Sequence, residues 1–188
     1  MNAELSDSAI IDEVLAGKTE SFATLVKRYQ NRVYSLGLRF LRNAEDARDF
    51  AQEVFVKVFE KLFSFRGEAK FSTWLMKVAY YHGISVQRSR REAQSLAEDY
   101  ELPGRERGPE ELHARKAASA ALKEALRLLP ERYRLCIDLF FSFGMTYEEV
   151  SRVTDIPVGT VKSHVFRAKQ ALRQALKNSC AEDYDYGM

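Results

Sequence analysis

The first 102 residues of this 188-residue chain contain no proline, and their apolar side chains recur at steps of three and four. Proline interrupts helices, so its absence permits long ones. The runs Phe22–Phe40 and Ala47–Leu62 each predict a helix with one buried face. Asn43 is expected to cap the second of these helices, because its side chain can accept hydrogen bonds from the first turn.

Two further helices are expected in this half of the chain. A short one should run from about Asp7 to Ala16 and end near Gly17. Ser72 is expected to cap the other, which carries Trp74 on its apolar face. The residues before it, Ser64–Lys70, predict a loop.

All four prolines lie beyond residue 102. The stretch from about Gln94 to Pro109 loses the helical period and is rich in acidic residues, so it predicts a flexible linker. Helices are expected again over Leu112–Leu129 and, after a break at Pro130, over Tyr133–Phe143. No segment alternates with a period of two. The chain is therefore predicted to be all-α, with two small helical domains that each hold a modest core.

Composition excludes several classes of protein. With 46% hydrophobic residues the chain is not globally disordered, and no uncharged apolar stretch approaches the ~18 residues of a membrane helix. The N-terminal residues lack the basic and apolar regions of a secretory signal. Two cysteines, Cys136 and Cys180, are too few for a disulfide framework or a four-cysteine zinc site, and the cytoplasm is the expected location.

The net charge of +2 hides an uneven distribution. Residues 92–111 hold seven acidic and two basic side chains, whereas residues 158–177 hold five basic and no acidic ones. A basic segment of this kind indicates either a polyanion-binding surface or a solvated helix face.

The segment 145–168 carries the pattern of a helix-turn-helix. Thr146 is expected to cap a short helix, and Glu149 completes a capping box three residues later. Residues 154–157 then form a turn, and a second helix opens at residue 158 or 159. Its outward side presents donors of the kind that reach base edges and phosphates in a major groove. The candidate DNA-reading residues are Thr160, Lys162, Ser163, His164, Phe166, Arg167 and Lys169. The alternative is a helical hairpin with solvated lysines.

These motifs resemble a known family. The runs Leu129–Arg134, Thr146–Val150 and Gly159–Ala168 are similar to the promoter-binding domain of bacterial sigma factors of the extracytoplasmic-function group. Independently, Asp46–Phe55 resembles the polymerase-binding helix of that group, and Phe65–Leu75 resembles its promoter-melting segment. The resemblance spans about residues 22–176.

The resemblance implies a division of the chain. Residues 1–91 would bind core polymerase and melt the promoter, 92–112 would be a linker, 113–178 would bind the upstream promoter element, and 179–188 would be a tail. Asp49, Gln52 and Glu53 match the positions that grip the clamp helices of the largest polymerase subunit. Acidic groups there can pair with arginines of a partner. A solvated helix face is the alternative.

The resemblance also implies a site for single-stranded promoter DNA. Aromatic side chains beside cations suit such a strand, and the family reads one flipped base with the loop that corresponds to about residues 63–70. For Phe71 and Trp74 packing in the core is favoured over base contact. The candidate residues are Phe63, Arg66, Lys70, Phe71, Trp74, Tyr81, Arg88, Arg90 and Arg91.

Three positions depart from the family pattern. Tyr81 stands at the position of a common asparagine, and Ser85 at that of an aspartate. His164 stands where arginine is usual, so a different base preference is expected there, with a slight pH sensitivity of DNA binding if the imidazole becomes protonated.

A sigma factor directs promoter-specific transcription initiation, and the resemblance implies this function. The upstream element would be recognised as duplex, and the element near the start site would be melted. The implied partners are core RNA polymerase, through the clamp helices of the largest subunit and the flap of the second-largest, promoter DNA and an anti-sigma protein. No catalytic site, cofactor, metal or membrane insertion is expected.

Three alternatives stay open from the sequence. A DNA-binding regulator that never touches polymerase would explain the helix-turn-helix but not the Asp46–Phe55 or Phe65–Leu75 motifs. An enzyme is disfavoured because His82, His113 and His164 are scattered along the chain, without a catalytic or metal-ligand spacing. The basic face of residues 158–177 argues against an adaptor that binds only protein.

Overall fold

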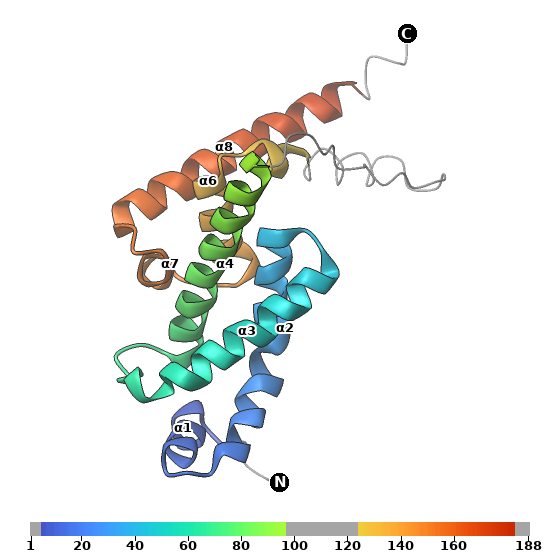
Figure 1. Cartoon of the computed structure of the whole chain (residues 1–188). Coiled ribbons are helices and arrows are strands. Elements are labelled where there is room, and N and C mark those ends of the chain that lie inside the picture. Colours follow the sequence, from blue (N-terminus) through green and yellow to red (C-terminus); the bar gives the residue numbers. More distant parts are fainter. Residues whose placement is uncertain (1–4, 97–123, 183–188) are drawn as a thin grey trace, which may run out of the picture. The chain divides into compact units, whose positions relative to one another are not determined.

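The structure is a computed structural model that describes residues 5–96 and 124–182 (Figure 1). The described residues form helices and turns, with no strand among them, as predicted for an all-α chain. They fall into two compact units, one made mainly by residues 5–96 and the other by residues 124–151 and 155–182. Most of the predicted linker, residues 97–112, lies outside the described residues.

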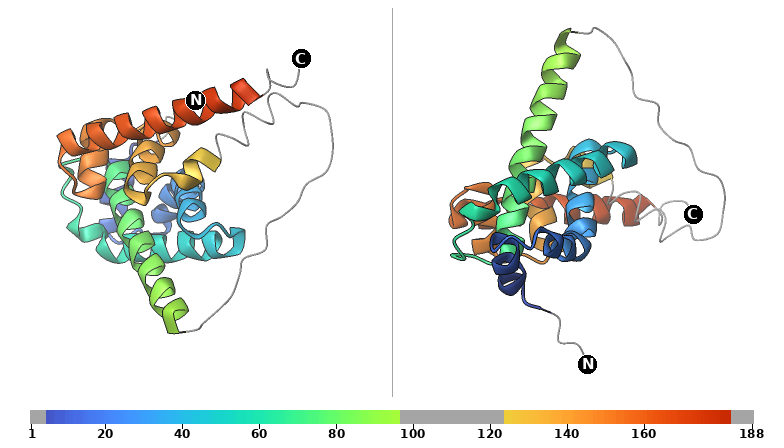
Figure 2. Two further views of the ribbon diagram at one scale, coloured as in Figure 1. Left: turned by 90° about the horizontal axis from the view of Figure 1, so that it is seen from above. Right: turned by 60° about the horizontal axis from the view of Figure 1, so that its bottom comes forward.

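Four α-helices make up the N-terminal unit. Helix α2 packs against both α3 and α4, and α3 also contacts α4, an arrangement that both views of Figure 2 show. Helix α1 packs on α2, next to a short 3₁₀ turn. The bounds are α1 Asp7–Leu15, η1 Thr19–Ser21, α2 Phe22–Leu41, α3 Ala44–Lys61, η2 Leu62–Ser64 and α4 Phe71–Leu96.

The predicted cap of α3 is confirmed. The side-chain oxygen of Asn43 accepts hydrogen bonds from the backbone N–H groups of Glu45 and Asp46, at 2.8 and 3.2 Å. Arg42, just before it, adopts the left-handed conformation with φ 56°, which ends α2 and lets the chain reverse within two residues. Helix α1 begins at Asp7, as predicted, and Ser6, which was not predicted as a cap, accepts a hydrogen bond from the N–H of Ala9.

The predicted start of α4 is wrong by two residues, because a cap at Ser72 would place the first helical residue at Thr73. The helix begins at Phe71, and the carbonyl of Lys70 accepts from the N–H groups of Thr73 and Trp74. Ser72 therefore lies inside the first turn and is not the cap. The helix also continues to Leu96, past the point at which the linker was expected to begin.

Two glycines allow the helices of this unit to approach closely. A Cβ at Gly37 would lie 2.7 Å from the ring of Phe50 and 3.2 Å from the Cα of Ala47, where α2 crosses α3. At Gly83, where α4 crosses α2, it would lie 2.5 Å from the ring of Phe40. All three distances are shorter than a normal carbon–carbon contact, so only glycine fits at these crossings without a shift.

The C-terminal unit is built around the contact of α6 with α8. Its core holds Leu129, Ile137 and Ala168, with Leu126, Tyr133 and Leu172 packed against them. The bounds are α6 Glu131–Ile137, a π-helical turn η3 Asp138–Ser142, α7 Tyr147–Thr154 and α8 Val158–Glu182, and residues 124–128 are helical as well.

Pro130 marks the break that the sequence predicts. It is the N-cap of α6, which starts two residues earlier than expected and continues into η3. Of the helix predicted over Leu112–Leu129, the part up to residue 123 lies outside the described residues, as do residues 183–188 of the predicted tail.

Candidate functional site

The helix-turn-helix of the C-terminal unit has the predicted local geometry. The hydroxyl of Thr146 accepts from the backbone N–H of Glu149 at 3.1 Å, and the Glu149 carboxylate accepts from the backbone N–H of Thr146 at 3.0 Å. Asp155 takes the left-handed conformation that ends α7. The Ser151 hydroxyl donates to the carbonyl of Ile156 at 2.6 Å, which ties the turn to α7. Helix α8 then opens at Val158.

One side of α8 is buried and the opposite side is open to solvent. Val161, Val165 and Ala168 are buried, as the period predicts. Among the predicted DNA-reading residues, Thr160, Lys162, Ser163, Phe166 and Arg167 are exposed, and Phe166 keeps 59% of its surface. The exposed side of the first three turns is therefore a row of donors with one aromatic ring.

Neighbouring rings orient the cations of this row. The Arg167 guanidinium donates to the Tyr133 hydroxyl at 3.0 Å. The Lys162 ammonium lies 5.7 Å from the centre of the Tyr147 ring, and half-buried Lys169 lies 4.8 Å from that of Phe141. These contacts hold the cations without neutralising them, because no carboxylate is involved.

His164 differs from the rest of the row. It is half-buried, its ring packs 4.9 Å from that of Tyr133, and its Nδ1 lies 3.7 Å from the Sγ of Cys136. Burial, together with Arg132 and Arg167, lowers the pKa of His164. The imidazole is thus neutral near pH 7, and any pH sensitivity falls at a lower pH than for an ordinary histidine. Burial raises the pKa of the Cys136 thiol to about 11, so this cysteine is an unreactive core residue.

The polar edge of α3 lies on the surface of the N-terminal unit. Asp49, Gln52 and Glu53 are exposed, as their positions on the helix predict. The Glu53 carboxylate lies 2.8 Å from the Nε2 of His82 on α4, yet it keeps 59% of its side-chain surface. A partner can therefore reach all three side chains.

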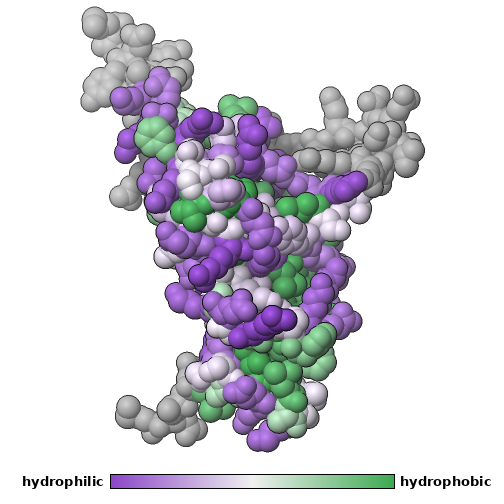
Figure 3. Space-filling model, turned by 90° about the vertical axis from the view of Figure 1, so that its left-hand side faces the viewer, coloured by the Kyte–Doolittle hydropathy of each residue, from purple (hydrophilic) through white to green (hydrophobic). Residues whose placement is uncertain are grey.

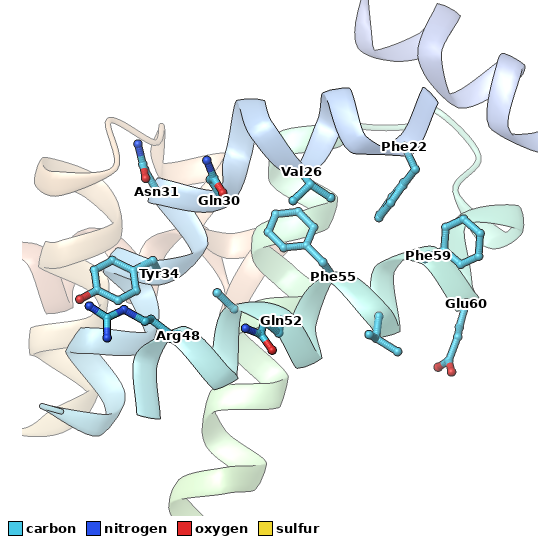
Figure 4. A pocket seen from close by; sticks show the side chains of 12 residues that line it. Phe22, Val26, Gln30, Asn31, Tyr34, Arg48, Gln52, Phe55, Phe59 and Glu60 are labelled. Atoms are coloured by element: carbon cyan, nitrogen blue, oxygen red, sulfur yellow. The ribbon is translucent and has the colours of Figure 1, made fainter. Parts of the chain in front are cut away.

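An apolar groove of about 1110 Å³ runs beside this edge, between α2 and α3 (Figure 4). Phe22 and Phe59 meet edge to face across it at 5.1 Å. The sequence pattern placed Phe22 and Phe59 on the buried faces of their helices, although Phe59 remains 42% exposed. Val56, which lies outside that pattern, is 57% exposed. The groove is lined by Phe22, Val26, Gln30, Asn31, Tyr34, Arg48, Ala51, Gln52, Phe55, Val56, Phe59 and Glu60.

The loop before α4 separates exposed from buried aromatic side chains. Phe63 is 78% exposed, and Arg66 and Lys70 are exposed as well. Phe71 is only 3% exposed and packs against the rings of Phe65 and Trp74, at 5.7 and 5.9 Å. Phe71 is thus packed in the core, the alternative that the sequence favoured for it over base contact. Figure 3 shows hydrophobic side chains gathered at the end of this unit that carries α1.

A second cleft, of about 400 Å³, lies between α3 and α4. Tyr81 is half-exposed there, with the Lys77 ammonium 6.0 Å from the centre of its ring. Sequence reasoning included Trp74 and Tyr81 but missed the lysines, which come from two different helices. The cleft is lined by Lys57, Lys61, Trp74, Lys77, Val78, Tyr81, His82 and Ser85.

The basic end of α4 follows this cleft. Arg88 and Arg90 are exposed, and Arg90 forms an ion pair with Asp46 of α3 at 2.9 Å. The side chains of Arg91 and Cys180 lie outside the described part of the structure. Within that part, no group of three His, Cys, Asp or Glu side chains could hold a metal ion, and no helix has the length and hydropathy needed to cross a membrane.

Comparison with known proteins agrees with this geometry. The family model for sigma-70 region 2 matches residues 25–93, and that for sigma-70, region 4, matches residues 119–172. The RNA polymerase sigma-H factor of Pseudomonas aeruginosa is 34% identical over 187 residues, which cover 94% of this chain and 97% of the relative. The ECF RNA polymerase sigma-E factor of Escherichia coli is 34% identical over 182 residues, covering 92% and 95%. The chain belongs to the extracytoplasmic-function (ECF) sigma factors.

Solved structures share the fold of this sigma factor. The sigma factor RpoE in complex with the anti-sigma factor NepR, from Bartonella quintana, has a TM-score of 0.66 at 23% identity and covers 84% of this chain and 98% of its own. CnrH in complex with the cytosolic domain of CnrY has a TM-score of 0.67 at 23% identity, covering 92% and 97%. Sigma factors bind core RNA polymerase and promoter DNA and direct promoter-specific initiation, and this function applies to the chain.

Proposed function

We propose that this sigma factor docks on core polymerase through α3. Asp49, Gln52 and Glu53 would receive cations of the clamp helices of the largest subunit, and the α2/α3 groove would receive apolar side chains beside them. The observation that carries this proposal is an exposed acidic edge next to an apolar groove, because charged groups steer an encounter and apolar burial holds it. Residues 1–91 form the docking and melting domain.

The α3/α4 cleft would hold a base of the melted promoter strand. Tyr81 and Trp74 offer rings for stacking, and the lysines offer cations for the adjoining phosphates. Base stacking contributes roughly 1–3 kcal/mol per base, and flipping a base from duplex costs a few kcal/mol. A stacked base in the cleft and a second one on exposed Phe63 would therefore offset the opening of a short segment. The basic residues Arg66, Lys70, Arg88, Arg90 and Arg91 would guide the strand.

Helix α8 would read the upstream promoter element as duplex, within a domain of residues 113–178 that also contacts the flap of the second-largest subunit. The exposed row from Thr160 to Arg167 supports this role, because the first turns of a recognition helix meet base edges. His164, being half-buried, would contribute less to direct base contact than the arginine usual at this position.

Regulation by an anti-sigma protein is part of the proposal. One solved structure of similar fold is a sigma factor in complex with an anti-sigma factor, and another is CnrH in complex with the cytosolic domain of CnrY. The site of action would be the cytoplasm, where a polymerase subunit meets its promoters.

Run-off transcription tests the proposed function. Core polymerase and a pool of promoter fragments are combined with and without the purified chain. Initiation at selected sequences that requires the chain is expected. Specific duplex binding without initiation would instead favour a regulator that acts without polymerase.

A charge-reversal variant tests the docking edge. Replacing Asp49, Gln52 and Glu53 together by lysine should abolish binding to core polymerase and leave helicity unchanged, since all three are exposed. Thermal unfolding should shift only by the loss of the Glu53–His82 contact. A well-folded triple variant that still retains core polymerase in a pull-down would show that docking uses another face.

A further inference from the structure

His82 lies at the seam between α3 and α4, with only 5% of its side chain exposed. Its ring stacks on that of Phe50, with centres 5.1 Å apart and planes inclined by 23°. A histidine so deeply buried loses its solvation, and its polar atoms need partners within the protein. The sequence motifs and the proposed function above leave this residue unused.

Both ring nitrogens of His82 face charged groups of α3. Nδ1 lies 3.0 Å from the Nζ of Lys57, and Nε2 lies 2.8 Å from the Oε2 of Glu53. An ammonium can only donate, so Nδ1 must carry the lone pair and the proton must sit on Nε2, which lies beside the carboxylate but has no aligned hydrogen-bond acceptor among the described residues. Burial and Lys57 lower the pKa of His82, which agrees with a neutral ring.

The three side chains join two surfaces. Glu53 belongs to the exposed edge of α3, whereas Lys57 and His82 line the α3/α4 cleft. In that cleft Lys57 is accompanied by Lys61 and Lys77. The His82 ring is thus the direct link between the carboxylate on one surface and the cationic wall of the other.

We propose that His82 is a positioning residue that couples docking at Glu53 to the binding of single-stranded DNA in the α3/α4 cleft; this rests on the proposed function. In the free chain the Glu53 carboxylate contacts the His82 ring, and its negative charge partly offsets the positive charge of Lys57 on the other side of that ring. When a cation of polymerase pairs with Glu53, the carboxylate no longer offsets the charge of Lys57. The cleft then attracts a phosphodiester more strongly, and by linkage a bound strand strengthens docking.

The expected strength of the coupling depends on how far Glu53 is exposed to solvent. Glu53 is more than half exposed, so solvent screens its interaction with Lys57. We therefore expect a coupling factor of about 5, at the lower end of the 5–150-fold range usual for linked sites.

The test measures the affinity of the full chain for core polymerase with and without a saturating oligonucleotide. The oligonucleotide is the non-template strand of a promoter recovered by run-off transcription. For the wild-type chain the strand should tighten core binding. In His82→Leu the tightening should fall by about 5-fold, while core binding without the strand stays within a factor of about 2. Contacts between polymerase and the strand are the same in both and cancel.

Three further variants sharpen the result. His82→Gln keeps one donor and one acceptor and should restore most of the coupling. Glu45→Gln removes an exposed carboxylate from the first turn of α3 and should behave as wild type. On a Glu53→Gln background, His82→Leu should have no further effect on the tightening, because the link is already broken.

Each outcome bears on the proposal in a defined way. Undiminished tightening in a folded His82→Leu variant would overturn it, as would an equal loss of core affinity with and without the strand. Should the leucine variant fail to fold, the Glu53→Gln single variant still decides, because it breaks the same link and should reduce the tightening to the same extent. A wild-type chain that does not bind core polymerase at all would overturn the proposed function, and the coupling with it.

Discussion

At the scale of single residues, the side chains with the clearest roles are those held by one specific neighbour. Arg167 is exposed on α8, and its guanidinium is held by the hydroxyl of Tyr133. Because the Arg167 side chain is already held in one orientation, it loses less conformational freedom on binding DNA than an unrestrained arginine would. The neighbour matters to binding even though it makes no contact with DNA itself.

Arg167→Ala should weaken binding of the holoenzyme to its selected promoter by roughly 1–3 kcal/mol, the usual contribution of a bidentate base contact. Tyr133→Phe should have a smaller effect in the same direction, because it frees the guanidinium without removing it. Lys177→Ala, an exposed cation in the last part of α8, serves as the control. Promoter titrations measure all three, and equal affinities for wild type and Arg167→Ala would contradict the placement of Arg167 at the DNA.

The pH dependence of stability follows from His82. Burial first, and Lys57 second, lower the pKa of this histidine below its ordinary value of 6.5, against the opposing effect of Glu53. The unfolded chain therefore binds the proton more readily than the folded one. Stability is complete above about pH 6.5 and is lost as the pH falls through that value toward the folded pKa.

Urea unfolding followed by the fluorescence of Trp74, the single tryptophan, measures this effect in the N-terminal unit. Between about pH 7.5 and pH 5.5 the His82→Leu variant should lose less stability than wild type. His164→Leu, in the other unit, should leave this transition unchanged. If wild type and His82→Leu lose the same stability between these two pH values, the pKa of His82 is not lowered in the folded chain.

At the scale of helices, close crossings decide the packing of the N-terminal unit. Gly83 lets α4 approach α2 so that the Phe40 ring covers the helix backbone directly. The same crossing brings Phe40 against Tyr80, with ring centres 6.1 Å apart. The position of α4, and hence the α3/α4 cleft, depends on this contact.

Gly83→Ala should destabilise the chain despite its better helix propensity. The added Cβ would lie 2.5 Å from two atoms of the buried Phe40 ring. Overpacking of this kind costs typically 1–3 kcal/mol, whereas alanine gains about 1 kcal/mol over glycine in a helix. Gly159→Ala, where a Cβ meets nothing within 4 Å, should not lower stability. Denaturant midpoints compare the two, and a Gly83→Ala variant as stable as wild type would show that the crossing can relax.

At the scale of the whole molecule, the distribution of charge matters more than its sum. The net charge of +2 predicts no strong attraction to DNA. The cations are instead concentrated on α8 and around the α3/α4 cleft, and the exposed acidic edge lies on α3. Opposite charges on separate surfaces suit a protein that binds a polyanion with some faces and a basic protein surface with another.

Promoter binding by the holoenzyme should therefore weaken steeply with salt. Each phosphate contact contributes about −0.9 to the slope of log K against log salt concentration. Lys162→Ala and Lys169→Ala should each reduce the slope by about that amount if these lysines contact phosphates. Lys18→Ala, at an exposed lysine of the N-terminal unit, should leave the slope unchanged. Promoter affinity measured over a salt series gives the slopes. An unchanged slope in a variant that carries both Lys162→Ala and Lys169→Ala would exclude phosphate contacts by these lysines.

Local patterns in the sequence predicted most of the helices, the caps at Asn43 and Thr146, the helix-turn-helix and the family. These features depend on residues within about four positions of one another, so period and capping reveal them directly. The shared cleft of lysines from α3 and α4, and the contacts of His82 with Glu53 and Lys57, emerged only from the packing of the helices. Such contacts join residues far apart in the chain, and they depend on the distance at which helices cross, which here is set by glycines and rings that no local pattern marks.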